Sequence, residues 1–320
     1  MPPLLIAKNL KKIFQTSRGN LHAVDDVSFH VDKGETLGLV GESGCGKSTL
    51  GRLLIRLLDA TEGDVIFDGL EVLSLPKDEM KMLRRRMQIV FQDPYSSLSP
   101  RLSVSDLIAE PLSIHGYESG AARMNRVREL MEIVGLAKRL ETVYPHELDG
   151  GRRQRIGIAR ALALNPEFIV LDEPVSALDV CIQAQVLNLL NSLKKDFGYT
   201  YVFISHNLSV VRHVSDRIAV MYLGEIVELS DYRKMFENPL HPYTQALLSA
   251  IPIAKVGEER KKWQRERIIL EGEVPSPIEP PEGCRFAPRC THKNDSCDEQ
   301  SPRLVELEPE HFVACHRVGK

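Results

Sequence analysis

Residues 41–49 read GESGCGKST, and this stretch decides the fold. It fits the pattern G-x-x-x-x-G-K-[ST], in which the glycines let backbone N–H groups converge on phosphate oxygens. A short apolar run at residues 36–40 precedes it, and residues 50–58 follow with helical spacing. Because strand, loop and helix in this order are the context that such a loop requires, we predict a nucleotide-binding α/β domain.

The loop offers groups for both phosphate and metal. We expect Lys47 to reach the β and γ phosphates and the Ser48 hydroxyl to bind Mg²⁺. A chance glycine turn is the alternative, but a lysine, a serine and a threonine all stand where the motif needs them. The predicted nucleotide contacts in the loop are Gly41, Ser43, Gly44, Cys45, Gly46, Lys47, Ser48 and Thr49.

A second stretch, FIVLDE at residues 168–173, is an apolar run that ends in two carboxylates. A buried strand would carry Asp172 to its C-terminal end, where the side chain can orient Mg²⁺. Glu173 would then act as general base toward the attacking water. Alone, these residues fit an ordinary strand end with exposed carboxylates; together with the loop they favour ATP hydrolysis.

Strand and helix patterns alternate along the chain as far as about residue 235, which predicts a mostly parallel sheet with helices on both faces. Alternating polarity at residues 23–31 indicates a half-buried strand, and we expect an antiparallel β-subdomain near the N-terminus. A helical pattern at residues 105–140 predicts an inserted helical subdomain over about residues 95–160. Other expected elements are strands at 65–67, 88–91 and 201–205 and an amphipathic helix at 182–197.

Residues 148–154, LDGGRRQ, lie between the two halves of the nucleotide site. A Gly-Gly turn that opens a basic helix at this place resembles the signature sequence of ABC transporter ATPases. The resemblance covers residues 4–235 and implies a P-loop NTPase cassette with ATP and Mg²⁺ as cofactors. It also implies a catalytic set of Lys47, Glu173 and His206.

Four single residues carry the same resemblance. Gln92 matches the Q-loop glutamine that contacts Mg²⁺, and Asp179, in SALD at 176–179, matches the D-loop. His206 matches the switch histidine that contacts the γ-phosphate, and Phe14 stands where the family has an aromatic ring that stacks on adenine. Each also has an ordinary interpretation: Phe14 as a core residue, Gln92 as a surface residue, and His206 as a cap on a strand end.

The signature itself departs from the family pattern Leu-Ser-Gly-Gly-Gln at Asp149 and Arg152, while Gly150 and Gly151 are kept. In the family this segment faces the γ-phosphate bound by a second subunit. An ionised Asp149 cannot donate a hydrogen bond and repels phosphate, which Arg152 would partly offset. We therefore predict an asymmetric heterodimer with one slow ATP site. Alternatively, Asp149 is simply a good N-cap for the following helix.

Beyond about residue 235 prolines are frequent, and we expect residues 236–320 to be an appended, irregular segment and not more of the core sheet. The charged stretch at 258–269 has helical character. Residues 237–248 (ENPLHPYTQALL), 272–277 (GEVPSP) and 283–290 (GCRFAPRC) look like the C-terminal region of ATPases that serve dipeptide and oligopeptide importers. Some relatives of that family transport nickel, so the cargo stays open.

Four of the six cysteines lie near the C-terminus with the spacing C-x5-C-x6-C-x17-C. Soft thiolates at irregular spacing favour an Fe–S cluster or zinc. Structural zinc usually shows C-x2–4-C pairs, so the spacing favours [4Fe–4S], with Zn²⁺ as the alternative and free thiols or disulfides as the remaining one. Some peptide-importer ATPases carry a cluster in this region. The predicted ligands are Cys284, Cys290, Cys297 and Cys315.

The net charge of −3 does not indicate a nucleic-acid partner. The sequence holds no run of 18 apolar residues and no signal-peptide layout at its start, so we expect a cytosolic chain. The resemblance implies a paralogous ATPase bound head to tail, two membrane permeases and, indirectly, an extracytoplasmic solute-binding protein. This places the chain peripherally at the cytoplasmic face of the membrane. A soluble, non-transport ABC ATPase and a regulatory module with an inactive site are the alternatives.

Overall fold

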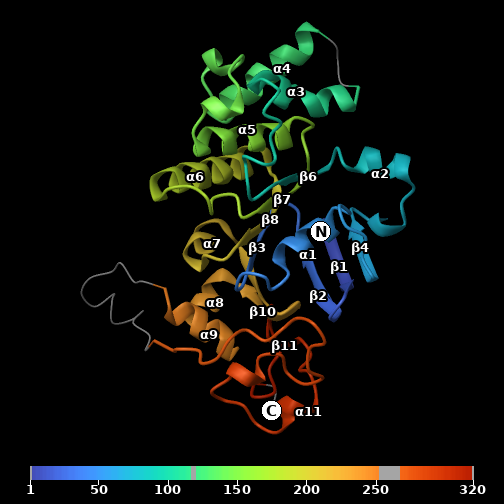
Figure 1. Ribbon diagram of the computed structural model, residues 1–320, viewed down its shortest axis with the longest axis vertical. Helices are drawn as coiled ribbons and strands as arrows, with labels where there is room; N and C mark the ends of the chain where they lie inside the picture. The colour runs from blue at the N-terminus through green and yellow to red at the C-terminus, as the bar shows by residue number, and fades with distance from the viewer. Residues whose placement is uncertain (1, 117–119, 252–266, 319–320) are drawn as a thin grey trace, which may run out of the picture. The chain divides into compact units, whose positions relative to one another are not determined.

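The computed structural model describes residues 2–116, 120–251 and 267–318 (Figure 1). The chain forms two compact units: residues 1–4, 31–36 and 67–204 make the first, and residues 5–30, 37–66 and 205–320 make the second. The helical character expected at 258–269 falls outside the described residues as far as residue 266. Within the described ranges, no helix has the length and apolar content needed to cross a membrane.

The first unit is built on three parallel strands: β6 (Met87–Val90), β7 (Phe168–Asp172) and β8 (Thr200–Ser205). β7 lies between the other two, and Phe168 stands opposite Met87 on one side and Thr200 on the other. All residues of β7 are buried, as expected for a central strand in a parallel sheet. The predicted parallel arrangement is confirmed, and β7 ends at Asp172 as predicted.

Helices make up most of the remaining first unit, and α3, α4 and α5 pack against one another as the inserted helical subdomain (Figure 1). The helical block predicted at 105–140 is two helices, because Gly116 (φ +63°) and Gly120 (φ +69°) leave the helical conformation. The elements are β5 (Leu70–Glu71), η1 (Val72–Ser74), α2 (Lys77–Leu83), α3 (Val104–Ile114), α4 (Ala121–Ile133), η2 (Lys138–Leu140), η3 (Pro145–Glu147), α5 (Gly150–Leu162) and α6 (Val180–Phe197).

The second unit begins with two long strands, β1 (Leu5–Thr16) and β2 (Gly19–Val31). Only two residues join them, so they run antiparallel, and β4 (Glu62–Phe67) lies on the other side of β1. These strands form the predicted N-terminal β-subdomain. A second set of strands in this unit has β3 (Thr36–Val40) parallel to β9 (Arg217–Tyr222) and β10 (Glu225–Asp231) antiparallel to β9.

The helices of the second unit up to residue 251 are α1 (Lys47–Leu54), α7 (Leu208–Val214), α8 (Tyr232–Glu237) and α9 (Pro242–Ser249). α1 starts directly at the end of the phosphate loop. It ends before the predicted residue 58, because Arg56 has a φ of +50°, which breaks the helix.

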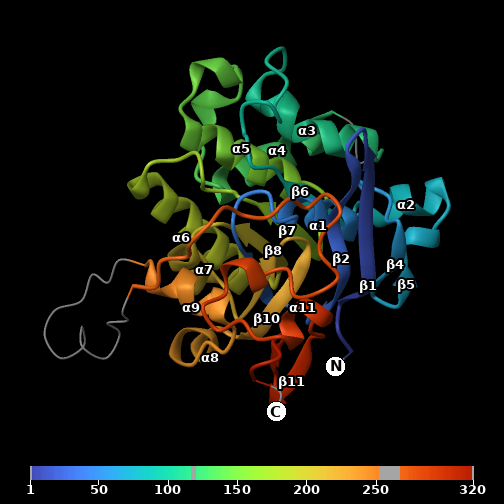
Figure 2. The ribbon, with the colours of Figure 1, turned by 60° about the horizontal axis from the view of Figure 1, so that its bottom comes forward.

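The C-terminal segment adds two strands to a core sheet. The expectation that residues 236–320 contribute no strands to that sheet is therefore wrong. β12 (His311–Val313) pairs antiparallel with β10, and β11 (Val305–Glu308) pairs with β12 (Figure 2). An edge strand such as β10 leaves backbone groups to be paired, and a three-residue strand is too short to show a sequence period. In the described residues from 267 to 304 the segment is mostly irregular, with η4 (Ala287–Arg289) and α11 (Ser296–Glu299).

Candidate functional site

The phosphate loop lies in the second unit and connects β3 to α1. Glycine is required where the loop backbone runs against its neighbours. A Cβ atom on Gly46 would lie 2.0 Å from the carbonyl oxygen of Ala23, and one on Gly41 would lie 2.1 Å from that of Met221. Gly46 also has a φ of +106° and directly precedes α1, whose first N–H groups have no acceptors within the helix. The loop therefore has the geometry for binding phosphate at a helix start.

Lys47 is the first residue of α1 and is only 5% exposed. Its Nζ donates to the carbonyl oxygens of Gly41 at 2.9 Å and Glu42 at 2.8 Å, and it lies 3.6 Å from Sγ of Cys45. Burial raises the pKa of the Cys45 thiol, so this sulfur is a neutral, weak acceptor. A phosphate oxygen is a stronger acceptor for an ammonium group than a carbonyl or a thiol, so the lysine is placed to exchange partners when phosphate arrives.

The acidic strand end lies in the first unit. Asp172 is 2% exposed at the end of β7, and Glu173 follows with a φ of +45° and donates its backbone N–H to Ile204 at 3.0 Å. Positive φ is uncommon outside glycine and often marks a functional position. Nε2 of Gln92 donates to Oε2 of Glu173 at 3.0 Å. The structure thus brings together three predicted site residues that are up to 81 positions apart.

The signature segment caps α5. Asp149 is the N-cap residue, and its Oδ1 accepts the backbone N–H of Arg152 at 2.8 Å, while Oδ2 lies 3.5 Å from Nε of Arg152. Both side chains are about half exposed. A Cβ on Gly151 would lie 2.5 Å from Cγ2 of Ile182, so the small residue is needed where α5 meets α6. The ordinary interpretation of Asp149 as a helix cap is therefore supported by direct geometry.

The other predicted residues are placed as follows. Asp179 is the N-cap of α6, and its Oδ1 accepts the N–H of Ile182 at 3.0 Å. His206 is exposed directly after β8, at the start of the last segment of the second unit. Phe14 lies on β1 and is half-buried, with Nζ of Lys12 at 5.0 Å from its ring centre, so it is not a core residue.

Four cysteines that are up to 31 positions apart in the sequence line one small cavity of the second unit: Cys284, Cys290, Cys297 and Cys315. The thiols are free and form no disulfide, and nowhere in the described ranges do three or more His, Cys, Asp or Glu side chains stand as a group that could hold a metal ion. Burial raises the pKa of Cys284 to about 11 and also raises that of Cys290 and Cys315. The cavity measures about 10 Å³, roughly the space of one water molecule.

Sequence reasoning missed a group of side chains that touch the phosphate loop from the C-terminal segment. The hydroxyl of Tyr243 accepts the backbone N–H of Glu42 at 2.9 Å, and Arg289 forms an ion pair with the Glu42 carboxylate at 2.9 Å. Arg285 binds the turn that precedes β10. Two arginines inside the stretch 283–290 were a visible signal, but nothing in the sequence said what they contact.

Two family profiles match the chain. Residues 24–176 match the family described as "ABC transporter", and residues 227–297 match "Oligopeptide/dipeptide transporter, C-terminal region". The chain is 53% identical to the oligopeptide transport ATP-binding protein AppF of Bacillus subtilis, over 95% of this chain and 92% of that protein. This chain belongs to the ABC transporter ATP-binding proteins. The predicted family and its ATPase activity are thereby confirmed.

Other relatives of this ABC ATPase agree. The putative oligopeptide transport ATP-binding protein YkfD of Bacillus subtilis is 54% identical over 98% of this chain and 95% of that protein. Among solved structures, the ATP-binding cassette MJ0796, a dimer in a post-hydrolysis state bound to ADP and Pi, is similar with a TM-score of 0.66 and 32% identity. That similarity covers 72% of this chain and 99% of the cassette, which confirms the predicted cassette fold.

Proposed function

We propose that this ABC ATPase powers the uptake of peptides through membrane permeases at the cytoplasmic face of a membrane. The observation that carries the proposal is the oligopeptide/dipeptide transporter C-terminal region at residues 227–297. AppF and YkfD, which are named for oligopeptide transport, match nearly the whole chain at 53% and 54% identity. Cargo itself would be captured by a separate solute-binding protein, so this chain supplies energy and not cargo recognition.

We propose that Lys47 binds the β and γ phosphates of ATP, together with the loop residues from Gly41 to Thr49. Glu173 holds the attacking water and accepts its proton, and the amide of Gln92, 3.0 Å away, orients that carboxylate. His206 contacts the γ-phosphate, and Phe14 stacks on adenine. The half-buried position of Phe14 on β1 supports this role, since one face of a stacking ring must remain accessible.

Mg²⁺ would be held by the Ser48 hydroxyl, the Gln92 side-chain oxygen and the Asp172 carboxylate. Three hard oxygen donors fit the preference of this ion, and the buried position of Asp172 at the end of β7 fixes one of them. When bound, the ion neutralises charge that develops on the transferred phosphoryl group.

We propose that the functional unit is a head-to-tail pair with a paralogous ATPase, in which Asp149, Gly150, Gly151, Arg152 and Asp179 face the partner's nucleotide. An ionised Asp149 disfavours γ-phosphate, so the partner's ATP turns over slowly. Single-turnover hydrolysis at the two sites tests this. Asp149→Ser is expected to accelerate the slow site, and equal rates at both sites in the unaltered pair would refute the asymmetry.

For the four clustered cysteines we propose a soft-metal centre. Their spacing predicts [4Fe–4S], with Zn²⁺ as the alternative, and all four residues line one cavity. Since no three of them stand as a metal-holding group in the described part of the chain, metal binding would require these side chains to move closer together. Metal that binds these residues in the folded chain and not in the unfolded chain would stabilise this segment. Iron, sulfide and zinc analysis of anaerobically purified chain decides between them. A metal-free chain with its native unfolding temperature would eliminate both.

The peptide-import proposal is tested in the reconstituted transporter. Peptide-loaded solute-binding protein should stimulate ATP hydrolysis, and Glu173→Gln should reduce that rate by about 10²-fold or more while ATP still binds. Asp196→Asn, an exposed carboxylate on α6, is the matched control and should hydrolyse ATP normally. Stimulation by nickel-loaded and not by peptide-loaded binding protein would overturn the proposed cargo.

A further inference from the structure

The C-terminal segment forms an ion pair with the start of the phosphate loop. Nη1 of Arg289 lies 2.9 Å from Oε2 of Glu42, the second residue of the loop. The Arg289 side chain is 9% exposed and that of Glu42 is 27% exposed, so this ion pair is largely shielded from water. Shielded, hydrogen-bonded charge pairs hold their geometry far better than surface pairs.

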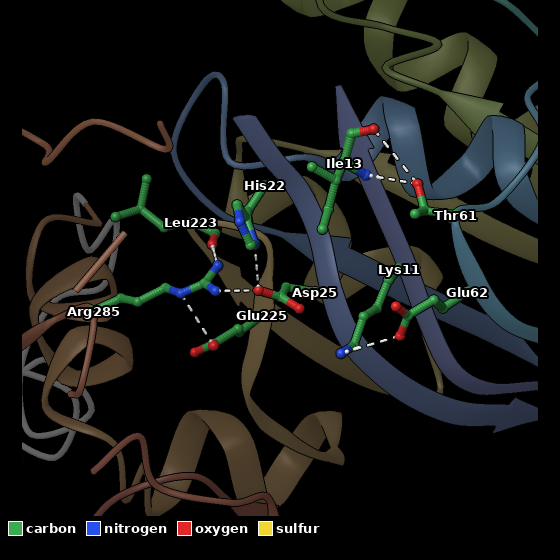
Figure 3. Close-up of polar contacts among 9 residues, drawn as sticks. All are labelled: Lys11, Ile13, His22, Asp25, Thr61, Glu62, Leu223, Glu225 and Arg285. Atoms are coloured by element: carbon green, nitrogen blue, oxygen red, sulfur yellow. Dashed lines mark hydrogen bonds and ion pairs between the residues drawn. The ribbon is translucent and has the colours of Figure 1, made fainter. Parts of the chain in front are cut away.

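A second set of contacts connects the C-terminal segment to the loop through the turn between β9 and β10. Arg285, 7% exposed, donates from Nη1 to the carbonyl oxygen of Leu223 at 2.5 Å and pairs with the carboxylates of Asp25 and Glu225 (Figure 3). The next residue of that turn, Gly224, donates its N–H to the carbonyl oxygen of Cys45 at 2.9 Å. Arg285 therefore fixes a turn that is hydrogen-bonded to the middle of the phosphate loop.

Packed aromatic side chains hold the contacts of Arg285 and Arg289 in a fixed position relative to each other. Tyr222 packs edge-on against Tyr243, with ring centres 4.7 Å apart, and against Phe286, at 5.3 Å. Tyr243 accepts the N–H of Glu42 at 2.9 Å, and Phe286 stands in the chain between the two arginines. Buried aromatic pairs of this kind are rigid and well packed, so a displacement of the segment 285–289 would be transmitted to Glu42.

We propose that Arg285 and Arg289 are positioning residues for the phosphate loop, through which the C-terminal segment sets the affinity of the subunit for ATP. Glu42 places a carboxylate in a loop that must accept a polyanion, and Arg289 neutralises it. Arg285 holds the backbone of the loop through Gly224 and Cys45. The inference rests on the proposed role of this loop in binding ATP.

The test measures the dissociation constant of Mg·ATP on the full chain and the KM and kcat of the reconstituted transporter. Arg289→Gln should raise Kd and KM about tenfold and change kcat less than twofold, because the arginine does not touch the reacting atoms. Arg289→Lys keeps the charge and should recover most of the affinity. Glu42→Gln should make Arg289→Gln nearly silent, since the charge to be neutralised is gone.

The matched control is Arg303→Gln, because Arg303 is an exposed arginine of the same segment and forms no ion pair in the described part of the chain. Thermal unfolding without nucleotide identifies variants that fail to fold. Amide hydrogen exchange over residues 41–46 should rise in Tyr243→Phe, which loses the acceptor of the Glu42 N–H. Arg285→Gln, which loses the hydrogen bond to Leu223, should likewise raise hydrogen exchange over residues 41–46 and weaken Mg·ATP binding. The exchange measurement on Tyr243→Phe stays informative if Arg285→Gln does not fold.

Lys47→Ala distinguishes a failure of the positioning role of Arg289 from a failure of the assignment of this loop to ATP binding. If Lys47→Ala abolishes ATP binding while folded Arg289→Gln binds ATP as tightly as the unaltered chain, the positioning role is wrong and the loop assignment stands. If Lys47→Ala binds ATP normally, the assignment of the loop itself fails.

Discussion

Asp149 accepts the backbone N–H of Arg152 at 2.8 Å and thereby caps α5 at the position where the ABC signature usually has serine. Serine and aspartate are both good N-caps, whereas only serine can also donate a hydrogen bond to phosphate. The substitution therefore preserves the fold of the helix start and changes its chemistry toward a ligand. Substitutions of Asp149 can therefore test the helix cap separately from the proposed contact with nucleotide.

We expect Asp149→Ser to leave the free energy of unfolding within about 0.5 kcal/mol of the unaltered chain, because the cap is kept. Asp149→Ala loses the cap and should lower that free energy by about 1 kcal/mol. Urea unfolding of both variants measures this. Equal stability of the alanine and serine variants would show that the cap contributes nothing.

Gly151 and Gly157 lie on the same helix and should respond oppositely to alanine. A Cβ on Gly151 would lie 2.5 Å from Cγ2 of Ile182, whereas one on Gly157 meets no atom within 4 Å. Gly151→Ala should therefore cost about 1–3 kcal/mol, through overpacking against α6. Gly157→Ala should be neutral or stabilise by up to about 1 kcal/mol, since it reduces the freedom of the unfolded chain. Equal effects in urea unfolding would contradict this explanation.

Sequence reasoning predicted the elements that carry the candidate site residues, because these elements depend on short local motifs. The glycine loop, the strand ending at Asp172 and the cap at Asp149 are each set by a few adjacent residues, and the structure places them on the expected elements. The strand expected at 23–31 covers only the later part of β2, and the bounds of β1 were not predicted, because the sequence of β1 gives no sustained alternation of polar and apolar residues.

The contacts of the C-terminal segment could not be predicted from the sequence, because they join residues that are far apart along the chain. Arg289 and Glu42 are 247 positions apart, and no local pattern indicates their ion pair. The pairing of β12 with β10 depends on a buried edge and not on strand propensity. Proline-rich composition predicted an irregular segment, and the described residues 267–304 are mostly irregular, but composition does not reveal what such a segment contacts.

Glu225 makes the stability of the chain depend on pH. Burial raises the pKa of Glu225 to about 7, against the effect of Arg285 and with the help of Asp25 and Asp26. Between about pH 4.5 and pH 7 the folded chain keeps this proton and the unfolded chain releases it, so the free energy of unfolding falls as pH rises. Glu225→Gln mimics the protonated form and should remove this fall, which amounts to about 3 kcal/mol at most.

Chemical unfolding of both proteins at pH 5 and pH 8 measures the effect. The stability of Glu225→Gln relative to the unaltered chain should increase from the lower to the higher pH. The exposed Glu282, changed to Gln, is the control and should give no such difference. A constant difference between the two pH values for Glu225→Gln would refute the assignment.

Glu228, on β10, forms hydrogen bonds to the C-terminal segment. Substitutions of Glu228 should lower the free energy of unfolding more than those at most other positions outside the nucleotide site. Its side chain is fully buried and accepts the backbone N–H groups of Leu240 and His241, at 2.8 and 3.0 Å, and Nε2 of His311 at 2.8 Å. Glu228→Gln turns one acceptor into a donor that faces N–H groups, which should cost about 2–3 kcal/mol in urea unfolding. Glu228→Ala leaves three donors unsatisfied and should cost about 3–5 kcal/mol.

The control is the exposed Glu271, and its change to Gln should leave the free energy of unfolding unaltered. If Glu228→Gln also leaves that free energy unaltered, the hydrogen bonds of Glu228 do not hold the C-terminal segment in place.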